Sequence, residues 1–187
     1  MKQIISESES KLGGSVEAWR SERPPLEPSG QLEARSQVEP ALEPSKTILV
    51  VDDDAAVRQM LGRVLESEQY TVLRAKTGRE AAVLFLSAPP DLVLLDLNMP
   101  DRDGWEAFHL INAVNPMIPV IIITARPNQY EHATRLGVDA LMEKPLDLSL
   151  LLGTIGRLLA ESEAERVHRV NHPYFKTLHL NQPPKVP

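Results

Sequence analysis

The sequence predicts an α/β fold in which a five-stranded parallel sheet carries helices on both faces. From Lys46 onward, short apolar runs alternate with segments whose apolar residues recur at helical spacing. Three of the runs, 48–51, 92–95 and 119–123, are apolar at nearly every position, as expected of strands that helices cover on both faces. The connections are short, which favours right-handed crossovers between parallel neighbours.

The expected strands cover residues 46–51, 70–75, 91–96, 118–125 and 139–144. The expected helices cover residues 54–69, 78–88, 103–114, 128–137 and 147–167. Asp54 should cap the first helix and Gly137 should end the fourth, because these residue types suit those positions. The second and fifth strands are the least apolar, so they are placed at the edges, which gives the strand order 2-1-3-4-5.

Outside this alternating region the composition changes. Residues 1–45 are rich in Ser, Glu and Pro and cannot bury enough apolar surface to offset the entropy of ordering, so they are predicted to form a disordered arm. Residues 46–165 form the α/β domain. Residues 166–187 contain four prolines and no clear period, and are expected to form an irregular tail.

Composition narrows the functional class. The chain of 187 residues has a formal net charge of -6, which argues against direct binding to nucleic acid. It has no cysteine, so disulfides, thiolate catalysis and cysteine-based metal sites are excluded. The start of the chain lacks the apolar segment of a signal peptide, and no apolar run approaches the length of a membrane span. A cytoplasmic protein with no membrane contact is therefore expected.

Polar residues follow the strands at their carboxyl ends. Asp52 and Asp53 follow the first strand, Asp96 ends the third, Thr124 ends the fourth and Lys144 ends the fifth. In an open parallel sheet these ends meet at one edge, and ligands bind where the strand order reverses, here between the first and third strands. Three carboxylates, a hydroxyl and an ammonium group are therefore expected in one crevice.

This crevice predicts a particular chemistry. Carboxylates about 4 Å apart repel each other by roughly 1 to 4 kcal/mol, so the cluster requires a cation. Lys144 supplies one positive charge, and a hard divalent ion that prefers oxygen ligands would supply two. Mg²⁺ typically takes one or two carboxylates together with phosphate oxygens. The sequence therefore predicts a Mg²⁺ site that accepts a phosphoryl group.

Four motifs carry a family resemblance. The segments ILVVDDD, DLVLLDLNMPDRDGWE, IPVIIITA and EKP make residues 46–165 similar to the receiver domain of two-component response regulators, which has a flavodoxin-like fold. The resemblance implies that Asp96 accepts a phosphoryl group from a phosphohistidine. It also implies that Mg²⁺ is held by Asp52, Asp53, Asp96 and the backbone carbonyl of Asn98, with Asp53 as a direct ligand.

The resemblance also assigns the switch. Thr124 matches the hydroxyl that turns toward the phosphoryl group, Lys144 matches the invariant lysine, and the Lys144–Pro145 peptide bond should be cis. Three residues before the lysine the family usually has Tyr or Phe, whereas this sequence has Leu141, which puts the conventional output signal in doubt. Such a domain promotes only its own phosphorylation and dephosphorylation. Its expected partners are a sensor histidine kinase or a histidine phosphotransfer protein and a downstream protein target.

Three alternative functions compete with this one. A receiver-like module could signal by docking alone, which the complete site argues against but Leu141 leaves open. An aspartyl-nucleophile phosphatase of the haloacid dehalogenase type would carry Asp-x-Asp after the first strand, whereas Asp96-Leu97-Asn98 follows the third. A flavodoxin would need a neutral phosphate loop after the first strand, where this chain has three acids.

Overall fold

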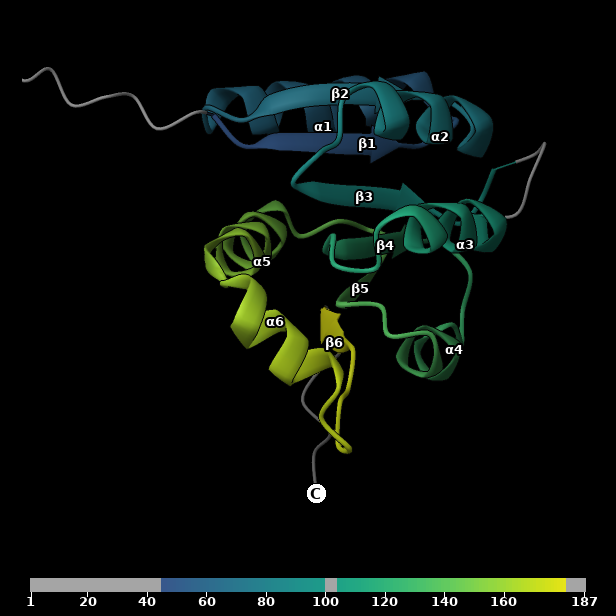
Figure 1. Cartoon of the computed structure of the whole chain (residues 1–187). Coiled ribbons are helices and arrows are strands. Elements are labelled where there is room, and N and C mark those ends of the chain that lie inside the picture. The colour runs from purple at the N-terminus through teal and green to yellow at the C-terminus, as the bar shows by residue number, and fades with distance from the viewer. Residues whose placement is uncertain (1–44, 100–103, 181–187) are drawn as a thin grey trace, which may run out of the picture. The chain divides into compact units, whose positions relative to one another are not determined.

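A computed structural model describes residues 45–99 and 104–180 and shows a six-stranded parallel sheet in the order β2-β1-β3-β4-β5-β6 (Figure 1). The strands are β1 (Thr47–Val51), β2 (Thr71–Ala75), β3 (Leu92–Asp96), β4 (Val120–Thr124), β5 (Ala140–Glu143) and β6 (Leu178–Leu180). All neighbouring pairs are parallel. The predicted α/β class and the order of the first five strands are confirmed. The predicted disordered arm lies outside the described residues, apart from Ser45.

Helices cover both faces of the sheet. They are α1 (Ala55–Ser67), α2 (Gly78–Ser87), α3 (Gly104–Val114), α4 (Tyr130–Arg135), α5 (Leu148–Ala160) and α6 (Glu163–Val170). Alternate strand residues face opposite sides. One side packs against α2, α3 and α4 and the other against α1 and α5. None of the helices within 45–99 and 104–180 is long and apolar enough to span a membrane.

Helix ends follow the signals in the sequence. The Asp54 carboxylate accepts hydrogen bonds from the amides of Ala56 and Val57, so Asp54 is the N-cap of α1 as predicted. Gly137 follows α4 with a φ of 77°, a left-handed conformation that costs glycine little. Its amide donates to the Thr134 carbonyl, which ends the helix as predicted.

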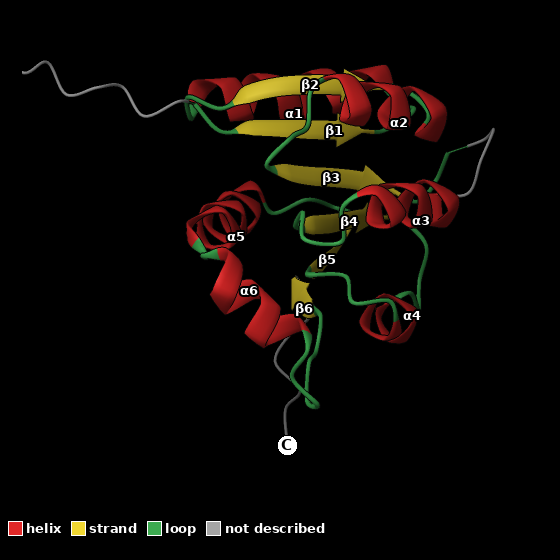
Figure 2. Cartoon of the chain, in the orientation of Figure 1, coloured by secondary structure: helices red, strands yellow, loops and turns green. Residues whose placement is uncertain are grey.

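The C-terminal part of the chain corrects the prediction. Instead of one helix over 147–167 and an irregular tail, α5 ends at Ala160, α6 follows, and β6 adds a sixth strand beyond β5 (Figure 2). Therefore β5 is not an edge of the sheet. The break occurs because Ser162 is extended and forms a capping box with Glu165, which starts a new helix.

Buried charge fixes α6 against the sheet. Asp139, directly before β5, is 1% exposed and accepts hydrogen bonds from Arg166 Nη2 at 3.0 Å and Arg169 Nη2 at 2.7 Å. The same carboxylate accepts the Val120 amide at 2.8 Å. A buried carboxylate is tolerated when it is paired and hydrogen-bonded, and Asp139 meets both conditions. The helix α6 is thus anchored to the amino end of β5.

Candidate functional site

Three carboxylates meet at the carboxyl ends of β1 and β3. Oxygens of Asp52, Asp53 and Asp96 all lie within 4.8 Å of one another. Asp52 and Asp96 are each 2% exposed, whereas Asp53 is exposed to solvent. Rigid, parallel strands hold the first and last of these acids, because Val51 and Leu95 are register partners in adjacent strands. The structure therefore brings together the acids that the sequence placed at this edge.

Lys144 reaches into the same cluster from the end of β5. Its Nζ lies 2.8 Å from Asp96 Oδ2 and 3.2 Å from Asp52 Oδ2. The backbone amide of Lys144 donates to the Thr124 carbonyl at 2.8 Å, so the lysine is held beside β4. The Lys144–Pro145 peptide bond is cis, as predicted.

The charges in the cluster are not balanced. Burial raises the pKa of the Asp52 carboxyl, and the opposing effects of the Asp54 amide and the Lys144 charge do not cancel it. Burial lowers the pKa of Lys144, but hydrogen bonding and attraction from Asp96, then Asp52, outweigh it and raise the pKa overall. The ammonium group is therefore held in its charged form, while burial disfavours the charge on the Asp52 carboxyl.

The turn after β3 shapes the rim of the site. The Asn98 amide donates to Asp96 Oδ1 at 2.9 Å, so both carboxylate oxygens of Asp96 have a hydrogen-bond donor. Gly104 begins α3 directly against this turn: a Cβ at that position would collide with the Asp96 carbonyl oxygen and Leu97 Cα. Glycine is thus required where the α3 backbone passes against the backbone of Asp96 and Leu97.

Thr124 is fully buried at the end of β4. Its hydroxyl oxygen accepts the Arg126 amide at 2.9 Å. Leu141 is also fully buried, within the apolar cluster on the side of the sheet that α4 covers, where Ala133 packs. The structure therefore places Thr124 at the end of the strand next to Asp96, and Leu141 in the core below rather than in the charged cluster.

Two arginines near the site were missed by sequence reasoning. Arg58, in the first turns of α1, donates from Nη1 to the backbone carbonyls of Asp52 at 2.6 Å and Asp53 at 3.2 Å. Arg126 donates from Nε to Asn98 Oδ1 at 2.8 Å and so joins the turns after β3 and β4. Their spacing was a usable signal, because Arg58 follows Asp54 by one helical turn and Arg126 follows Thr124 by two residues.

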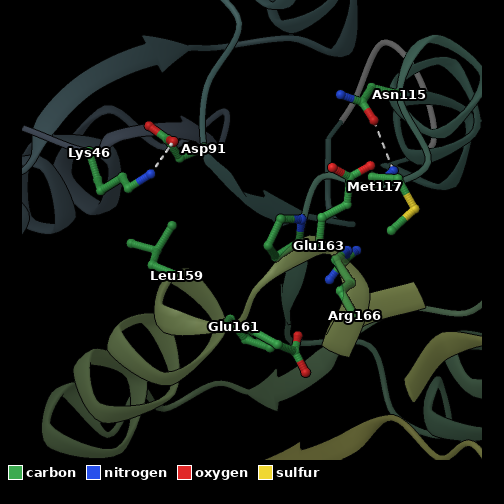
Figure 3. Close-up of a pocket in the computed structure, with 10 residues that line it drawn as sticks. Lys46, Asp91, Asn115, Met117, Leu159, Glu161, Glu163 and Arg166 are labelled. Atoms are coloured by element: carbon green, nitrogen blue, oxygen red, sulfur yellow. Dashed lines mark hydrogen bonds and ion pairs between the residues drawn. The ribbon is translucent and has the colours of Figure 1, made fainter. Parts of the chain in front are cut away.

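A separate hollow of about 350 Å³ lies at the amino ends of the strands, near the junction of α5 and α6 (Figure 3). No predicted site residue lines it. Lys46 pairs with Asp91 at 3.0 Å and Arg166 pairs with Asp139, while Glu161 and Glu163 add further acids to the lining. Among the described residues, acids close enough together to hold a metal ion are Asp52, Asp53 and Asp96, and none of these lines the hollow.

The model of one protein family, the response regulator receiver domain, matches residues 48–156. The chain belongs to this family. The match spans β1 through most of α5, so it includes every residue of the acidic cluster and Lys144. The resemblance predicted from the four motifs is confirmed, and this part of the chain is a receiver domain of the two-component type.

Known proteins agree with this assignment. The response regulator MprA of Mycolicibacterium vanbaalenii is 41% identical over 114 residues, which cover 60% of this chain and 49% of that protein. MprA of Mycobacterium ulcerans is 38% identical over 123 residues, covering 65% of this chain and 53% of the relative. The chain thus spans about half the length of the curated relatives it matches.

Solved receiver structures share the fold. A CheY-like receiver domain protein from Methanospirillum hungatei superimposes with a TM-score of 0.61 at 31% identity, covering 65% of this chain and 98% of that one. TrrA from Thermotoga maritima, solved in complex with Mg²⁺ and BeF, gives a TM-score of 0.57 at 31% identity, covering 60% and 98%. The two matches leave 35% and 40% of this chain outside the shared fold.

Proposed function

We propose that this receiver accepts a phosphoryl group on Asp96 from the phosphohistidine of a sensor histidine kinase or a histidine phosphotransfer protein. One observation carries the proposal: Lys144 Nζ bridges Asp96 and Asp52, while Asp53 completes an acidic cluster beside them. A nucleophilic carboxylate, a fixed cation and two further acids are what phosphoryl transfer to aspartate requires. Of the described residues, these are the ones grouped in this way.

The transfer is a simple exchange of bonds. A carboxylate oxygen of Asp96 attacks phosphorus, the bond from phosphorus to the histidine nitrogen breaks, and an acyl phosphate forms on Asp96. The Asn98 amide and Lys144 hold the carboxylate in one orientation, so little reorganisation precedes the attack. Lys144 then faces the negative charge spread over the phosphoryl oxygens.

The donor set suits Mg²⁺. Three carboxylates with oxygens within 4.8 Å of one another match the hard oxygen ligands that the ion prefers, and one lysine contacts only two of these acids. Asp52, Asp53 and Asp96 would hold the ion, with the Asn98 carbonyl as a further oxygen ligand. When bound, Mg²⁺ neutralises charge on the transferring group and on the carboxylates.

Phosphorylation would act on Thr124 next. Its hydroxyl is occupied with the Arg126 amide, so turning toward a phosphoryl oxygen gives up that hydrogen bond and frees the turn that leads to α4. The signal then passes to a protein target through the surface around α4 and β5. The chain is a stoichiometric acceptor and not an enzyme that turns over a separate substrate.

The test is intact mass measurement after incubation with Mg²⁺ and acetyl phosphate. We expect the wild type to gain the mass of one phosphoryl group, and Asp96→Asn to gain none. Asp91→Asn is the matched control, because Asp91 lies before the same strand at its opposite end and pairs with Lys46. Unchanged labelling of Asp96→Asn would contradict the proposal. A wild type that never labels would favour a module that works by docking alone.

A further inference from the structure

The edge of β5 is covered by the chain's own β6. Ala140, Leu141 and Met142 pair in parallel register with Leu178, His179 and Leu180. The Leu178 amide donates to the Asp139 carbonyl at 3.0 Å, and the buried hydroxyl of Thr177 donates to the Val138 carbonyl at 2.7 Å. Figure 1 shows β6 as the last strand of the sheet, beyond β5 and beside α6.

The side chains of β6 divide between the two faces of the sheet. Leu178 and Leu180 pack into the apolar cluster shared with α5. His179 points the other way, to the face that carries Leu141, and stacks on Tyr130 at the start of α4 with ring centroids 4.8 Å apart and 11° between planes. An imidazole from β6 therefore lies beside Leu141, between the sheet edge and α4.

The strand β6 and the helix α6 are held by different kinds of contact. The helix is fixed by two arginines on the buried Asp139 carboxylate, whereas β6 is three residues long and lies at the sheet edge. Short edge segments open at lower free energy than the strands of the core. Residues 171–177 separate the two elements, so β6 can leave while α6 stays in place.

Two routes connect β6 to the acidic cluster. Thr124 accepts the Arg126 amide, and the turn from 125 to 129 leads directly into α4, whose first residue is Tyr130. Trp105 Nε1 also donates to Gln129 Oε1 at 3.0 Å, so this turn is tied to α3.

The second route runs along β5. Glu143 is the register partner of Thr124, and its Oε1 lies 3.7 Å from His179 Nε2. The next residue, Lys144, carries the ammonium group that contacts Asp96. A displacement of Thr124 or Lys144 therefore reaches His179 from both of its neighbours, Tyr130 and Glu143.

We propose that the edge of β5 is a docking surface for an extended segment of a partner protein, which β6 occupies until Asp96 is phosphorylated. The inference rests on the phosphorylation proposed above. Loss of the hydrogen bond from Arg126 to Thr124 shifts the turn before α4, the stack of Tyr130 on His179 opens, and β6 leaves. The uncovered edge then offers unpaired backbone groups to a parallel strand.

The occupant seen in the structure defines the chemistry of the partner. The segment must run parallel to β5 and carry two apolar side chains separated by one residue, as Leu178 and Leu180 are. The residue between them must not depend on a stack with Tyr130, because the stack made by His179 opens when β6 leaves. A hydroxyl residue directly before the strand would take the place of Thr177 on the Val138 carbonyl.

The experiment uses the full chain with Mg²⁺, with and without beryllofluoride as a phosphoryl mimic. Amide hydrogen exchange of residues 178–180 should become faster, by about fivefold or more, when the mimic is added. A fluorescent peptide with the sequence of residues 175–180 and the substitution His179→Ala, which does not depend on the stack with Tyr130, should bind at least about fivefold more tightly in the same samples. The control peptide carries Leu178→Ser and Leu180→Ser and should not respond.

Two variants test whether the stack of His179 on Tyr130, rather than another part of the C-terminal segment, holds β6 in place. His179→Ala should speed exchange in β6 without any mimic, because the contact with Tyr130 is gone. Tyr174→Ala is the matched aromatic control, since Tyr174 is 82% exposed in the turn before β6, and it should leave exchange unchanged. Equal effects of the two variants would overturn the role given to the stack.

Acetyl phosphate labelling of the same preparation distinguishes the two proposals. If Asp96 is labelled while exchange in β6 and peptide affinity stay constant, this inference is wrong and the proposed function stands. If Asp96 is not labelled, both proposals are wrong, because the phosphorylation that would release β6 does not occur. A dimer that forms with the mimic and excludes the peptide would show a second copy on the edge and would overturn the assignment to a partner protein.

Discussion

Removal of the exposed acid of the cluster should stabilise the protein in the absence of metal. In Asp53→Asn, the side chain keeps its size but loses the charge that faces Asp52 and Asp96. Because Asp53 is exposed and Lys144 contacts the other two acids instead, the substitution breaks no ion pair among the described residues. The variant should therefore lose the electrostatic repulsion between Asp53 and the other two acids and keep its remaining contacts.

The magnitude follows from the spacing of the oxygens. At 4.8 Å, two unit charges repel by about 0.9 kcal/mol in bulk water and about 3.5 kcal/mol at an effective dielectric constant of 20. Because Asp53 is exposed, the value for bulk water applies, so repulsion from Asp52 and Asp96 together costs about 2 kcal/mol. Attraction between Asp53 and Lys144 offsets about half of this cost. A net gain of about 1 kcal/mol should raise the melting temperature by about 3–5 °C in EDTA.

With Mg²⁺ present, the wild type should become more stable than Asp53→Asn. At a concentration ten times its dissociation constant, Mg²⁺ should stabilise the wild type by about 1.4 kcal/mol, because it binds the folded state. Asp53→Asn should keep little of that gain, since it lacks the exposed ligand of the cluster.

The assay is thermal unfolding in EDTA and across a Mg²⁺ titration. Asp54→Asn is the control: it removes the same charge one residue away, and asparagine still caps α1, so its Mg²⁺ response should match the wild type. The reasoning is refuted if Asp53→Asn is less stable than the wild type in EDTA, or if it retains the full Mg²⁺ shift.

Two further substitutions test the core around β5. Arg166→Met should lower the free energy of unfolding by about 2–3 kcal/mol, which is below the usual cost of breaking a buried ion pair because Arg169 still contacts Asp139. The control is Arg157→Met, at an exposed position. Equal melting temperatures for the two variants would show that α6 does not depend on the pair of Arg166 and Asp139. Leu141→Tyr should lower the free energy of unfolding by about 1–3 kcal/mol, because the larger ring overpacks a fully buried position. Urea unfolding measures this change, and an unchanged midpoint would show that space for a ring already exists beside β6.

The central sheet and its charged rim could be predicted because their signals are local. Strands such as 92–96 are apolar at each position until the final acid, which fixes both their burial and the end at which the acid emerges. Parallel pairing then brings Asp96, Asp52 and Lys144 together without any knowledge of side-chain packing. The position of the site in the sheet therefore followed from the strand ends alone.

The C-terminal elements could not be predicted in the same way. Ser162 and Glu165 form a capping box, but they lie within a run whose helical period continues across them, so periodicity masked the break. The strand β6 is too short for alternation to be recognised, and its partners, Asp139 and Tyr130, are distant in the sequence. Pairing with β5 and the stack on Tyr130, rather than local propensity, make these three residues a strand.

The two ends of β5 show how equal burial can serve different purposes. Asp139, at the amino end of β5, is 1% exposed, and Asp96, which ends β3 and contacts Lys144 at the carboxyl end of β5, is 2% exposed. Asp139 faces two guanidinium groups and a backbone amide, so its charge is compensated within the fold and the group is structural. Asp96 shares the Lys144 ammonium with Asp52 and has Asp53 nearby, which leaves excess negative charge. Burial alone therefore does not distinguish the two acids. The uncompensated charge does, because a ligand that supplies positive charge would stabilise the cluster around Asp96 and not the one around Asp139.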